Sequence, residues 1–562
     1  MKTLALAVGV TCFGLLLGAA ACGSNETTSA GGGTGGSHVG ASGGTGGTHA
    51  GGTGGGQAGG PYVWQPDNIL NNGDFETGLM CWGNWIWSTT GQDYLGDYDF
   101  VLSADAHGGS SSLEIQCNGS DCLKAAIYTN DIYSPSGQAY SLSLYSKCPA
   151  GSDAIVYIPV TSTGELFQSL TCNDAWAENN LDFSADAAGT PLNIYAYNRS
   201  ATWLRVDDVV LTYGDGSVPL QTIQHLGTRN VTLDTHAVSV DGAPYLALGF
   251  FDVPYGALEQ VASLGANTAT ALGGQMGPDC FNTAQPSYLD HAFELGINVV
   301  PDSTTTARLD DAPVFANVMQ RFAPHRANIS WLLVDEPDQQ DVSWYYITAP
   351  TLVTEHDSAR TVTGLPIMAD FQRASWSNAS EVSPYSPSVE LWMAEPYGSD
   401  FGGVDHAIDM FASIQPRPVW LAQDPVDANL VVPKAWYVLV RGATGIIYFT
   451  WDGFQQDAAK LAAAGQAFAE IGSMKDAIFG SNVDAEVTAP AGVSFMARQA
   501  QGTTTIFAVN PTSQNAQGAF TVQGLAAGTV VTVQFESRTI TATAGQFSDS
   551  FAGVSRHVYV IP

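Results

Sequence analysis

The sequence has 562 residues, of which 45% are hydrophobic and 10% aromatic, and its formal net charge is −34. This length predicts about three or four domains, and the hydrophobic content is sufficient to build their cores. So large a negative charge repels nucleic acid and anionic lipid, which argues against both as direct partners and leaves a neutral polymer or a small neutral substrate compatible.

Residues 1–22 have the features of a secretory signal. Lys2 precedes an apolar stretch that is too short for a transmembrane helix, and small residues follow it. The ending Leu17-Gly-Ala-Ala-Ala-Cys22 resembles a bacterial lipobox, which implies cleavage before Cys22 and lipidation of its thiol. An ordinary signal peptide cut near Ala21 is the alternative. We therefore expect an exported cell-envelope lipoprotein, at the outer membrane or cell surface, that meets a membrane only through its lipid anchor.

Residues 23–60 are almost all Gly, Ser, Thr and Ala, and they predict a flexible tether. Export also permits disulfides in the folded part that follows. Two pairings are suggested by proximity in the sequence, although the connectivity is not fixed by it. The pairs are Cys117 with Cys122 and Cys148 with Cys172, which leaves Cys81 and Cys280 without assigned partners.

Residues 61–215 predict an all-β sandwich. Segments such as AYSLSLYSK, DAIVYIPV, LNIYAYN and WLRVDDVVLTY alternate or run apolar over strand length, with Gly, Ser, Asn and Asp between them. The opening NILNNGDFETGLMCWGNW, the segment GSSSL and the closing VDDV resemble the jelly-roll carbohydrate-binding modules attached to xylanases and cellulases.

That resemblance implies glycan binding through aromatic rings, for which Trp82, Trp85 and Trp87 are the candidates. The alternative is that these tryptophans belong to the core. The resemblance also implies a structural calcium ion, with Asp74 and Asp207 at the positions of its ligands.

Residues 216–480 predict a (β/α)8 TIM barrel, because apolar strands alternate with helical stretches. Two near-repeats end their helices in Leu-Gly-Ala-Asn and Leu-Gly-Ile-Asn, where the glycine favours a left-handed cap. An open nucleotide-binding sheet is the alternative, but no Gly-rich phosphate loop follows the first strand. The eight expected strands are 245–250, 267–272, 298–302, 330–335, 365–370, 389–394, 418–423 and 445–451. Residues 481–562 return to short strands and predict a small structural β-sandwich.

Carboxylates follow seven of the eight expected barrel strands. In a TIM barrel the carboxyl ends of the strands form the active face. The strand-end acids are Asp252, Asp302, Asp335, Glu336, Asp338, Asp370, Glu395, Asp424 and Asp452. Paired carboxylates with few basic groups suit glycoside hydrolysis, which requires no cofactor. No residue spacing indicates a metal site. Trp392, Tyr397 and Trp451 are candidate sugar-stacking rings, and packing is the alternative for each.

The segment Val-Asp-Glu-Pro-Asp at 334–338 resembles the Asn-Glu-Pro of clan A glycoside hydrolases. The resemblance implies that Glu336 is the proton donor and that Asp335 replaces the asparagine that contacts the sugar 2-hydroxyl. Asp335 also adds a like charge, which should raise one of the two pKa values. The clan places its nucleophilic glutamate after the seventh strand, where this chain has Gln423-Asp424. The partner of Glu336 is therefore Glu395, which repeats the Glu-Pro pattern, or Asp424, unless the strand count is off by one.

The sequence thus predicts a surface-anchored glycoside hydrolase that cleaves a polysaccharide, with a β-linked glycan and a retaining mechanism favoured. One alternative is a glycan-binding lipoprotein with a degenerate barrel, and another is an inverting glycosidase that uses the strand-four and strand-six acids. The expected substrate-binding residues are Asp252, Asp335, Trp392, Tyr397, Trp451 and Asp452 in the barrel and Trp82 and Trp85 in the module.

Overall fold

The computed structural model describes most of the chain after residue 66. The described ranges are 67–70, 72–76, 82–87, 98–117, 124–129, 132, 134–188, 190, 192–219, 223–272, 287–302, 324–338, 347–372, 378–398, 401–424 and 427–562. The predicted signal, the lipidation site Cys22 and the tether lie outside these residues. So do Cys81, Cys122 and Cys280 and the side chains of Trp85 and Trp87.

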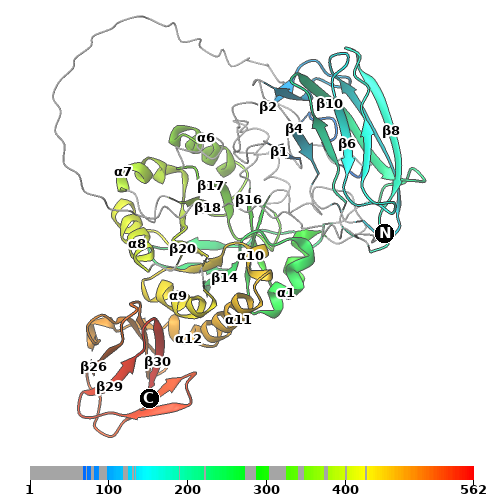
Figure 1. Ribbon diagram of the computed structural model, residues 1–562. Helices are drawn as coiled ribbons and strands as arrows, with labels where there is room; N and C mark the ends of the chain where they lie inside the picture. The colour runs from blue at the N-terminus through cyan, green and yellow to red at the C-terminus, as the bar shows by residue number, and fades with distance from the viewer. Residues whose placement is uncertain are drawn as a thin grey trace, which may run out of the picture. The chain divides into compact units, whose positions relative to one another are not determined.

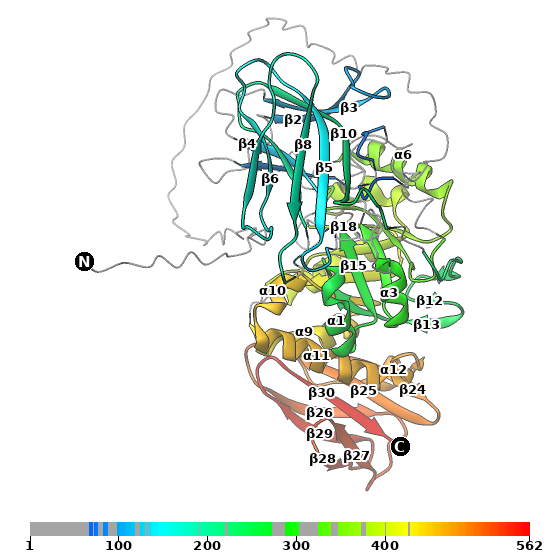
Figure 2. The same cartoon turned by 90° about the vertical axis from the view of Figure 1, so that its right-hand side faces the viewer.

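The first folded part consists of two five-stranded antiparallel sheets (Figure 2). One sheet has the order β1-β4-β9-β6-β7 (Gly83–Trp87, Lys124–Tyr128, Tyr195–Asn198, Ala154–Ile158, Leu166–Ser169). The other has the order β2-β3-β10-β5-β8 (Tyr98–Ser103, Ser112–Cys117, Trp203–Tyr213, Ala139–Lys147, Ala177–Ser184). Along β5 the buried residues Tyr140, Leu142 and Leu144 alternate with less buried ones, which is the two-residue period that the sequence predicts.

A disulfide joins Cys148, just after β5, to Cys172, just after β7, with a Cα–Cα distance of 4.8 Å. This confirms one of the two predicted pairings. Cys117 is also disulfide-bonded, and its partner lies outside the described residues. The two cysteines are 24 positions apart in the sequence. Their disulfide stabilises the sandwich mainly by reducing the conformational entropy of the unfolded chain.

Eight parallel strands close into a barrel, because β14 pairs with both β15 and β21 (Figure 1). All eight expected strands are confirmed, with boundaries that differ by no more than three residues. The strands are β14 (Ala247–Phe250), β15 (Thr268–Leu272), β16 (Asn298–Asp302), β17 (Trp331–Asp335), β18 (Ile367–Phe371), β19 (Leu391–Ala394), β20 (Val419–Gln423) and β21 (Gly445–Tyr448).

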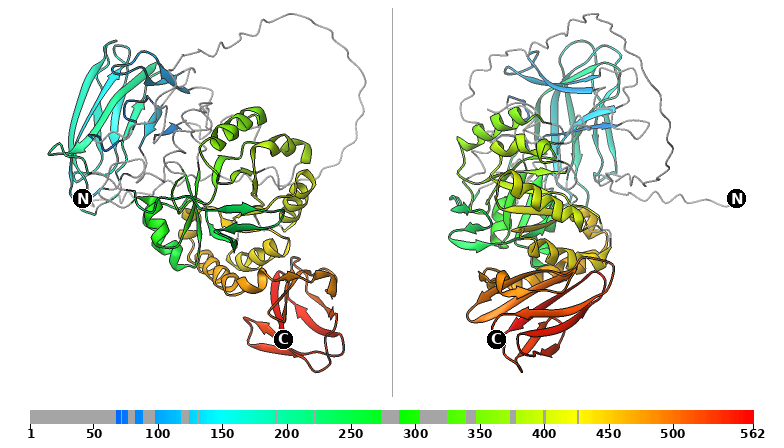
Figure 3. Two further views of the ribbon diagram at one scale, coloured as in Figure 1. Left: turned by 180° about the vertical axis from the view of Figure 1, so that it is seen from behind. Right: turned by 90° about the vertical axis from the view of Figure 1, so that its left-hand side faces the viewer.

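Helices surround the barrel, as seen from the front in Figure 1 and from behind in Figure 3. Gly265 after α1 and Gly296 after α3 both have positive φ, at 85° and 76°, which confirms the predicted glycine caps. The helices are η2 (Tyr255–Ala257), α1 (Leu258–Ser263), α3 (Tyr288–Glu294), α6 (Ala349–Arg360), α7 (Ala379–Val382), η4 (Ser383–Ser388), α8 (Gly402–Ile414), α9 (Ala428–Val440), α10 (Trp451–Gln455), α11 (Ala458–Ser473) and α12 (Lys475–Ile478).

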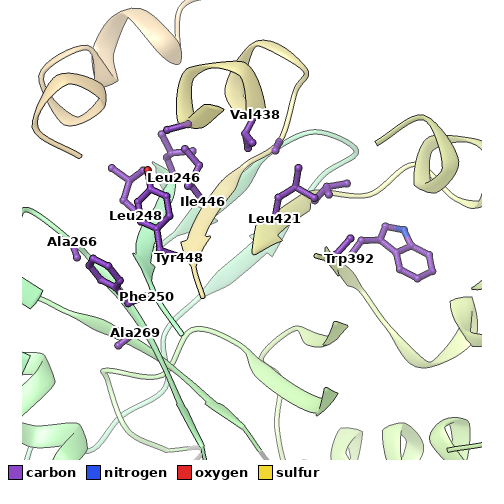
Figure 4. Packing of buried hydrophobic residues seen from close by; sticks show 14 of the residues in the cluster. Leu246, Leu248, Phe250, Ala266, Ala269, Trp392, Leu421, Val438, Ile446 and Tyr448 are labelled. Atoms are coloured by element: carbon purple, nitrogen blue, oxygen red, sulfur yellow. The ribbon is translucent and has the colours of Figure 1, made fainter. Parts of the chain in front are cut away.

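Alternate side chains of the barrel strands belong to two separate cores. One core lies between strands and helices and includes Leu248, Leu421 and Ile446 (Figure 4). The other fills the barrel and includes Met368, Met393 and Trp420, together with residues of the short sheet β11-β12-β13 (Val231–Leu233, Val238–Val240, Ala243–Tyr245). This alternation therefore shows which side chains of each strand point into the barrel.

The C-terminal residues form two antiparallel sheets around a core of their own. The larger sheet has the order β22-β24-β25-β30-β27-β28 (Ser481–Asn482, Ser494–Ala500, Thr503–Asn510, Ser555–Ile561, Val530–Gln534, Arg538–Thr541). The smaller has the order β23-β26-β29 (Val487–Thr488, Ala516–Val522, Gln546–Phe551), and η5 (Asp484–Glu486) precedes it. Phe507 on β25 stacks on Trp436 of α9 at 5.3 Å between ring centroids, which couples this part to the barrel. Within the described part of the chain, none of the helices combines the length and apolarity needed to cross a bilayer.

Candidate active site

Two buried acids point into the carboxyl end of the barrel because of strand alternation. Met368 on β18 and Met393 on β19 face the barrel interior. Asp370 comes two residues after Met368 on β18, and Glu395 comes two residues after Met393, directly after the end of β19, so both continue the inward face at the mouth. Asp370 is 0% and Glu395 3% exposed. The sheet thus delivers two carboxyl groups side by side into one buried space.

A break in strand regularity brings Glu336 to the same place. The pairing of β17 with β18 shifts register between Leu332 and Asp335. Glu336 then has a left-handed φ of 52°, and its N–H donates to the carbonyl oxygen of Asp370 at 3.0 Å. A non-glycine residue in this region carries a conformational cost of about 1–3 kcal/mol, which the surrounding structure must outweigh.

These acids form one group, here called the carboxylate cluster. Glu395 is in hydrogen-bond contact with both Asp370 and Glu336. One oxygen each from Asp335, Asp370 and Glu395 lie within 4.8 Å of one another. Asp338 adds a further charge that acts on Asp370. The carboxylate cluster consists of Asp335, Glu336, Asp338, Asp370 and Glu395.

Burial raises the pKa of Asp370 well above its usual range, and the charges of Glu336 and Asp338 raise it further. Burial likewise raises the pKa of Glu395, with added repulsion from Asp370, Glu336 and Asp335. Two carboxyl groups can hydrogen-bond each other only if one of them retains a proton. The cluster therefore combines a proton donor with carboxylates that can accept a proton or attack an electrophile.

The loop after β19 places Tyr397 beside this group. Burial and the neighbouring Glu395 raise the pKa of the Tyr397 hydroxyl, and its ring lies 5.1 Å from that of Phe449. The buried Lys434 of α9 supports the loop, because its Nζ donates to the carbonyl oxygens of Pro396 at 2.6 Å and Gly398 at 2.9 Å. Tyr397 is thus an aromatic and hydroxyl-bearing neighbour of Glu395, and its contact with a sugar stays a prediction.

A second set of acids gathers near the end of β14. Asp252 has a left-handed φ of 57°. Burial raises its pKa well above the usual range, and the charges of Asp302 and Asp452 add to that shift. Asp252 and Asp452, both predicted to bind substrate, therefore lie near each other, and neither is among the largest influences on the pKa values of Asp370 and Glu395.

Asp424 does not join the carboxylate cluster. Its Oδ1 lies 3.5 Å from Nζ of Lys460, and its side chain is 48% exposed. It is also not among the groups with the largest influence on the pKa values of Asp370 and Glu395. The preceding Gln423 is fully buried and donates through Nε2 to Ala422 at 3.0 Å. Of the two candidate partners, Glu395 contacts Glu336.

Trp392 and Trp451 are corrected from sugar-stacking residues to packing residues. Both are 0% exposed. Trp392 precedes an inward-facing residue and points away from the barrel interior, where it stacks on Phe411 at 4.7 Å and donates through Nε1 to Gln415 (Figure 4). Trp451 packs edge-on against Phe250 at 5.2 Å. Both rings belong to the core between strands and helices.

Trp82 is corrected in the same way. It is 5% exposed, its Nε1 donates to the carbonyl oxygen of Asn72 at 3.0 Å, and its ring lies 5.2 Å from Phe75. The indole N–H and the ring of Trp82 thus both contact other residues inside the sandwich. The backbone of Trp85 pairs with Ala126, while its side chain lies outside what the structure describes.

The sequence reasoning missed a group of five rings on the β1-β4-β9-β6-β7 sheet. Tyr195 and Tyr197 flank the core residue Ala196, so they lie on the face turned away from the core. Successive ring centroids lie 4.6–6.1 Å apart, and Phe167 is 57% exposed. The alternating Tyr-Ala-Tyr in LNIYAYN was the sequence feature from which these rings could have been predicted. We call this the outer aromatic face: Tyr128, Tyr157, Phe167, Tyr195 and Tyr197.

Asp74 and Asp207, the two predicted calcium ligands of the module, differ in the hydrogen bonds that they accept. Asp207 accepts backbone N–H groups from His107 at 2.7 Å, Gly108 at 3.2 Å and Asp208 at 2.8 Å. Burial raises the pKa of Asp207 to about 6. Asp74 accepts a long contact from the N–H of Glu76, at 3.5 Å. Calcium binding here stays a prediction.

No protein-family model and no curated protein sequence matches the chain. Solved structures give distant similarities. The CBM22-1–GH10 modules of Clostridium thermocellum endo-1,4-β-D-xylanase 10B, complexed with xylohexaose, match 69% of this chain and 95% of theirs, at 13% identity and a TM-score of 0.32. A GH30 endoxylanase from Clostridium papyrosolvens matches 56% of this chain and 96% of its own, at 12% identity and a TM-score of 0.40.

A third similar structure is the carbohydrate-binding module TmCBM61 in complex with β-1,4-galactotriose, which matches 26% of this chain and 98% of its own. Its identity is 16% and its TM-score 0.21. These three similar structures are thus two xylanases and a carbohydrate-binding module. At these identities and TM-scores the similarities are too weak to support a function.

Proposed function

We propose that this protein is a glycoside hydrolase that cleaves a polysaccharide, with a β-linked glycan as the favoured substrate. One observation carries the proposal: acids from three neighbouring strands meet at the carboxyl end of a closed parallel barrel, and Glu395 contacts Glu336 there. Opposed carboxyl groups with one shared proton are the groups that glycosidic bond cleavage requires.

In the proposed reaction Glu336 gives its proton to the glycosidic oxygen while the bond from that oxygen to the anomeric carbon breaks. Glu395 attacks the anomeric carbon to form a glycosyl ester. Water then displaces Glu395 and returns a proton to Glu336. Inverting enzymes hold their two carboxyl groups about 6.5–9.5 Å apart and retaining enzymes about 5–5.5 Å apart, so the close contact between these two groups is nearer to the retaining arrangement.

The proposed role of the sandwich is to hold the polysaccharide close to the barrel. The outer aromatic face supports this role, because flat rings in a row offer apolar area to the C–H faces of sugar rings. Cleavage of the signal at Cys22 and lipidation of that residue would tether both parts to the cell envelope through residues 23–60. In this proposal the protein acts on polysaccharides at the bacterial surface.

Glu336→Gln tests the catalytic assignment. The substitution keeps the size of the side chain but removes its proton, and we expect hydrolysis to fall by about 10²- to 10⁴-fold. Reducing-end release from a panel of β-linked polysaccharides measures the effect, and proton NMR of the first product gives its anomeric configuration. Asp409→Asn is the matched control, because this acid lies on α8 with its side chain 72% exposed. Full activity of Glu336→Gln would exclude Glu336 as the donor.

A second candidate function is glycan binding without hydrolysis. The fully buried Gln423 is the last residue of β20, the seventh barrel strand, at whose end clan A enzymes carry their nucleophilic glutamate, and it favours this candidate. Wild-type protein that binds polysaccharides and releases no reducing ends from any of them would support it. Turnover that depends on Glu336 would exclude it.

A further inference from the structure

A hollow of about 300 Å³ lies on the sandwich where the end of β3 meets the start of β10. Its volume is at the lower end of the range for small-molecule sites, which is about 300–1,000 Å³. The side chains of the described lining carry no charge. They are Gln116, Cys117, Pro149, Ala201, Thr202 and Trp203. The hollow therefore suits a small, neutral ligand.

Strand alternation places an aromatic ring and an amide on one wall of this hollow. Leu204 on β10 and Ile115 on β3 are both 0% exposed and belong to the core of the sandwich. Trp203 precedes Leu204 and Gln116 follows Ile115, so both side chains point away from that core and are partly exposed. They lie directly opposite each other in the pairing of β3 with β10 (Figure 2).

The next cross-strand pair holds both of these groups in place. The guanidinium of Arg205 lies over the Trp203 ring, 4.4 Å from its centroid. Arg205 donates in turn to Glu114, its partner across the strands, and to Asp105. Nε2 of Gln116 also donates to Glu114. Within the described part of the chain, no ring contact or hydrogen bond engages the other face of Trp203 or the amide oxygen of Gln116.

Covalent links hold the remaining walls. Cys117 is disulfide-bonded, and Pro149 directly follows Cys148, which is joined to Cys172. The carbonyl oxygen of Thr202 accepts the N–H of Cys117 at 3.2 Å, which ties the segment before β10 to the end of β3. Walls that are fixed in advance lose little conformational entropy when a ligand binds.

We propose that this hollow binds a neutral sugar unit, which stacks on Trp203 and hydrogen-bonds to Gln116. An indole ring offers a flat apolar surface to the C–H groups of a pyranose ring. The amide oxygen of Gln116 accepts a proton from a sugar hydroxyl, and the hydroxyl of Thr202 can donate or accept. Acidic and phosphorylated sugars fit less well, because a desolvated anion would meet no cation in the described lining.

This sugar site is separate from the outer aromatic face and does not depend on the proposed hydrolysis. The rings of the outer aromatic face lie on the β1-β4-β9-β6-β7 sheet, whereas Trp203 and Gln116 lie on the other sheet. Binding is measured without turnover, so a protein without hydrolytic activity still tests the site. Two sites on different sheets allow one module to hold two glycan segments, which strengthens attachment beyond either site alone.

Isothermal titration of the full-length protein with glucose, galactose, mannose, xylose and N-acetylglucosamine tests the proposal. We expect at least one of these sugars to bind with a millimolar Kd, and Trp203→Ala to weaken that binding about tenfold or more. Gln116→Leu should weaken it about three- to tenfold, because the variant loses the hydrogen bond to the sugar. Trp176→Ala is the matched control, since Trp176 directly precedes β8 of the same sheet and does not line the hollow.

If Trp203→Ala fails to fold, as judged by circular dichroism, Gln116→Leu carries the test with its own expected loss. Failure of every sugar to bind the wild type at millimolar concentrations would overturn the proposal. Binding that the folded Trp203 and Gln116 variants leave unchanged would also overturn it. Tyr195→Ala would then show whether the sugar occupies the outer aromatic face instead.

Discussion

Single residues in this protein acquire their roles from the direction in which the backbone presents them. Asp370 and Glu395 reach the barrel mouth because each lies two positions after an inward-facing methionine. Trp392 lies one position before Met393 and therefore points outward into packing. A shift of one residue along a strand thus separates a candidate catalytic acid from a core side chain.

The outer aromatic face leads to a prediction about single rings. Replacing Phe167 or Tyr195 with alanine removes a stacking surface, and we expect each change to weaken polysaccharide binding by about 1 kcal/mol, or about fivefold. Depletion assays with insoluble glycans measure the affinity. Val101→Ala, 39% exposed on the opposite sheet, is the matched control. Equal binding by all three variants would show that glycans do not use this face.

Elements of the barrel are tied to one another at the amino ends of the strands. His356 on α6 shares a hydrogen bond of 3.1 Å with Oε1 of Glu390, which directly precedes β19. The other oxygen of Glu390 accepts the N–H of Ile367, the first residue of β18, at 2.6 Å. One carboxylate thus joins a helix to two adjacent strands, and its charge is partly balanced by the imidazole.

The contact with Glu390 raises the pKa of His356 above its usual value, and Asp357 adds to the shift. Since the folded-state pKa exceeds the unfolded value of about 6.5, the stabilisation is complete below pH 6.5 and is lost as the pH rises through the folded-state pKa. We expect His356→Gln to lower the free energy of unfolding by about 1–2 kcal/mol at pH 6. Urea unfolding at pH 6 and pH 9 measures the effect. A difference from wild type that does not shrink at pH 9 would contradict this role.

The elements themselves were largely predictable. Each barrel strand is a short apolar run that ends at a polar residue, and this local signal was enough to find all eight strands and the acids after them. The pairing of Glu336 with Glu395 was favoured from the repeated Glu-Pro pattern but left open against Asp424, because the contact depends on the register shift after Leu332 and on the left-handed φ of Glu336. Neither feature leaves a local signal in the sequence.

Aromatic roles were predicted less well, for a physical reason. A tryptophan near a strand end has the same local pattern whether its Nε1 faces solvent or a buried carbonyl oxygen. Trp82 meets the carbonyl of Asn72, and Trp392 meets that of Gln415. The outer aromatic face combines β4, β6, β7 and β9, whose pairings cross long stretches of chain. Its members become neighbours only once the sheet order is known.

At the scale of the whole molecule, the barrel and the C-terminal sheets are joined by a buried polar contact. Glu470 on α11 accepts from Nε of Arg556 on β30 at 3.0 Å and from Nε1 of Trp436 on α9, also at 3.0 Å. The two charged side chains are 9% and 13% exposed. A pair buried to this degree is costly to break on one side, because the remaining charge stays desolvated.

We expect Glu470→Gln to lower the free energy of unfolding by about 3 kcal/mol, because Arg556 loses its nearest carboxylate. The double variant Glu470→Met/Arg556→Met should be less destabilised than Glu470→Gln alone, since it removes both charges. Guanidinium denaturation followed by tryptophan fluorescence measures both. A double variant at least as unstable as the single one would argue against a role for charge at this contact.

The left-handed backbone at Glu336 has a consequence for anyone who redesigns this barrel. Idealised proteins avoid non-glycine residues with positive φ, and a procedure that maximises stability would place glycine or asparagine at this position. The same procedure would treat Asp252, with its φ of 57°, in a similar way. Thermostabilised versions selected without an activity screen would therefore tend to lose the very carboxylate that the fold positions at its mouth.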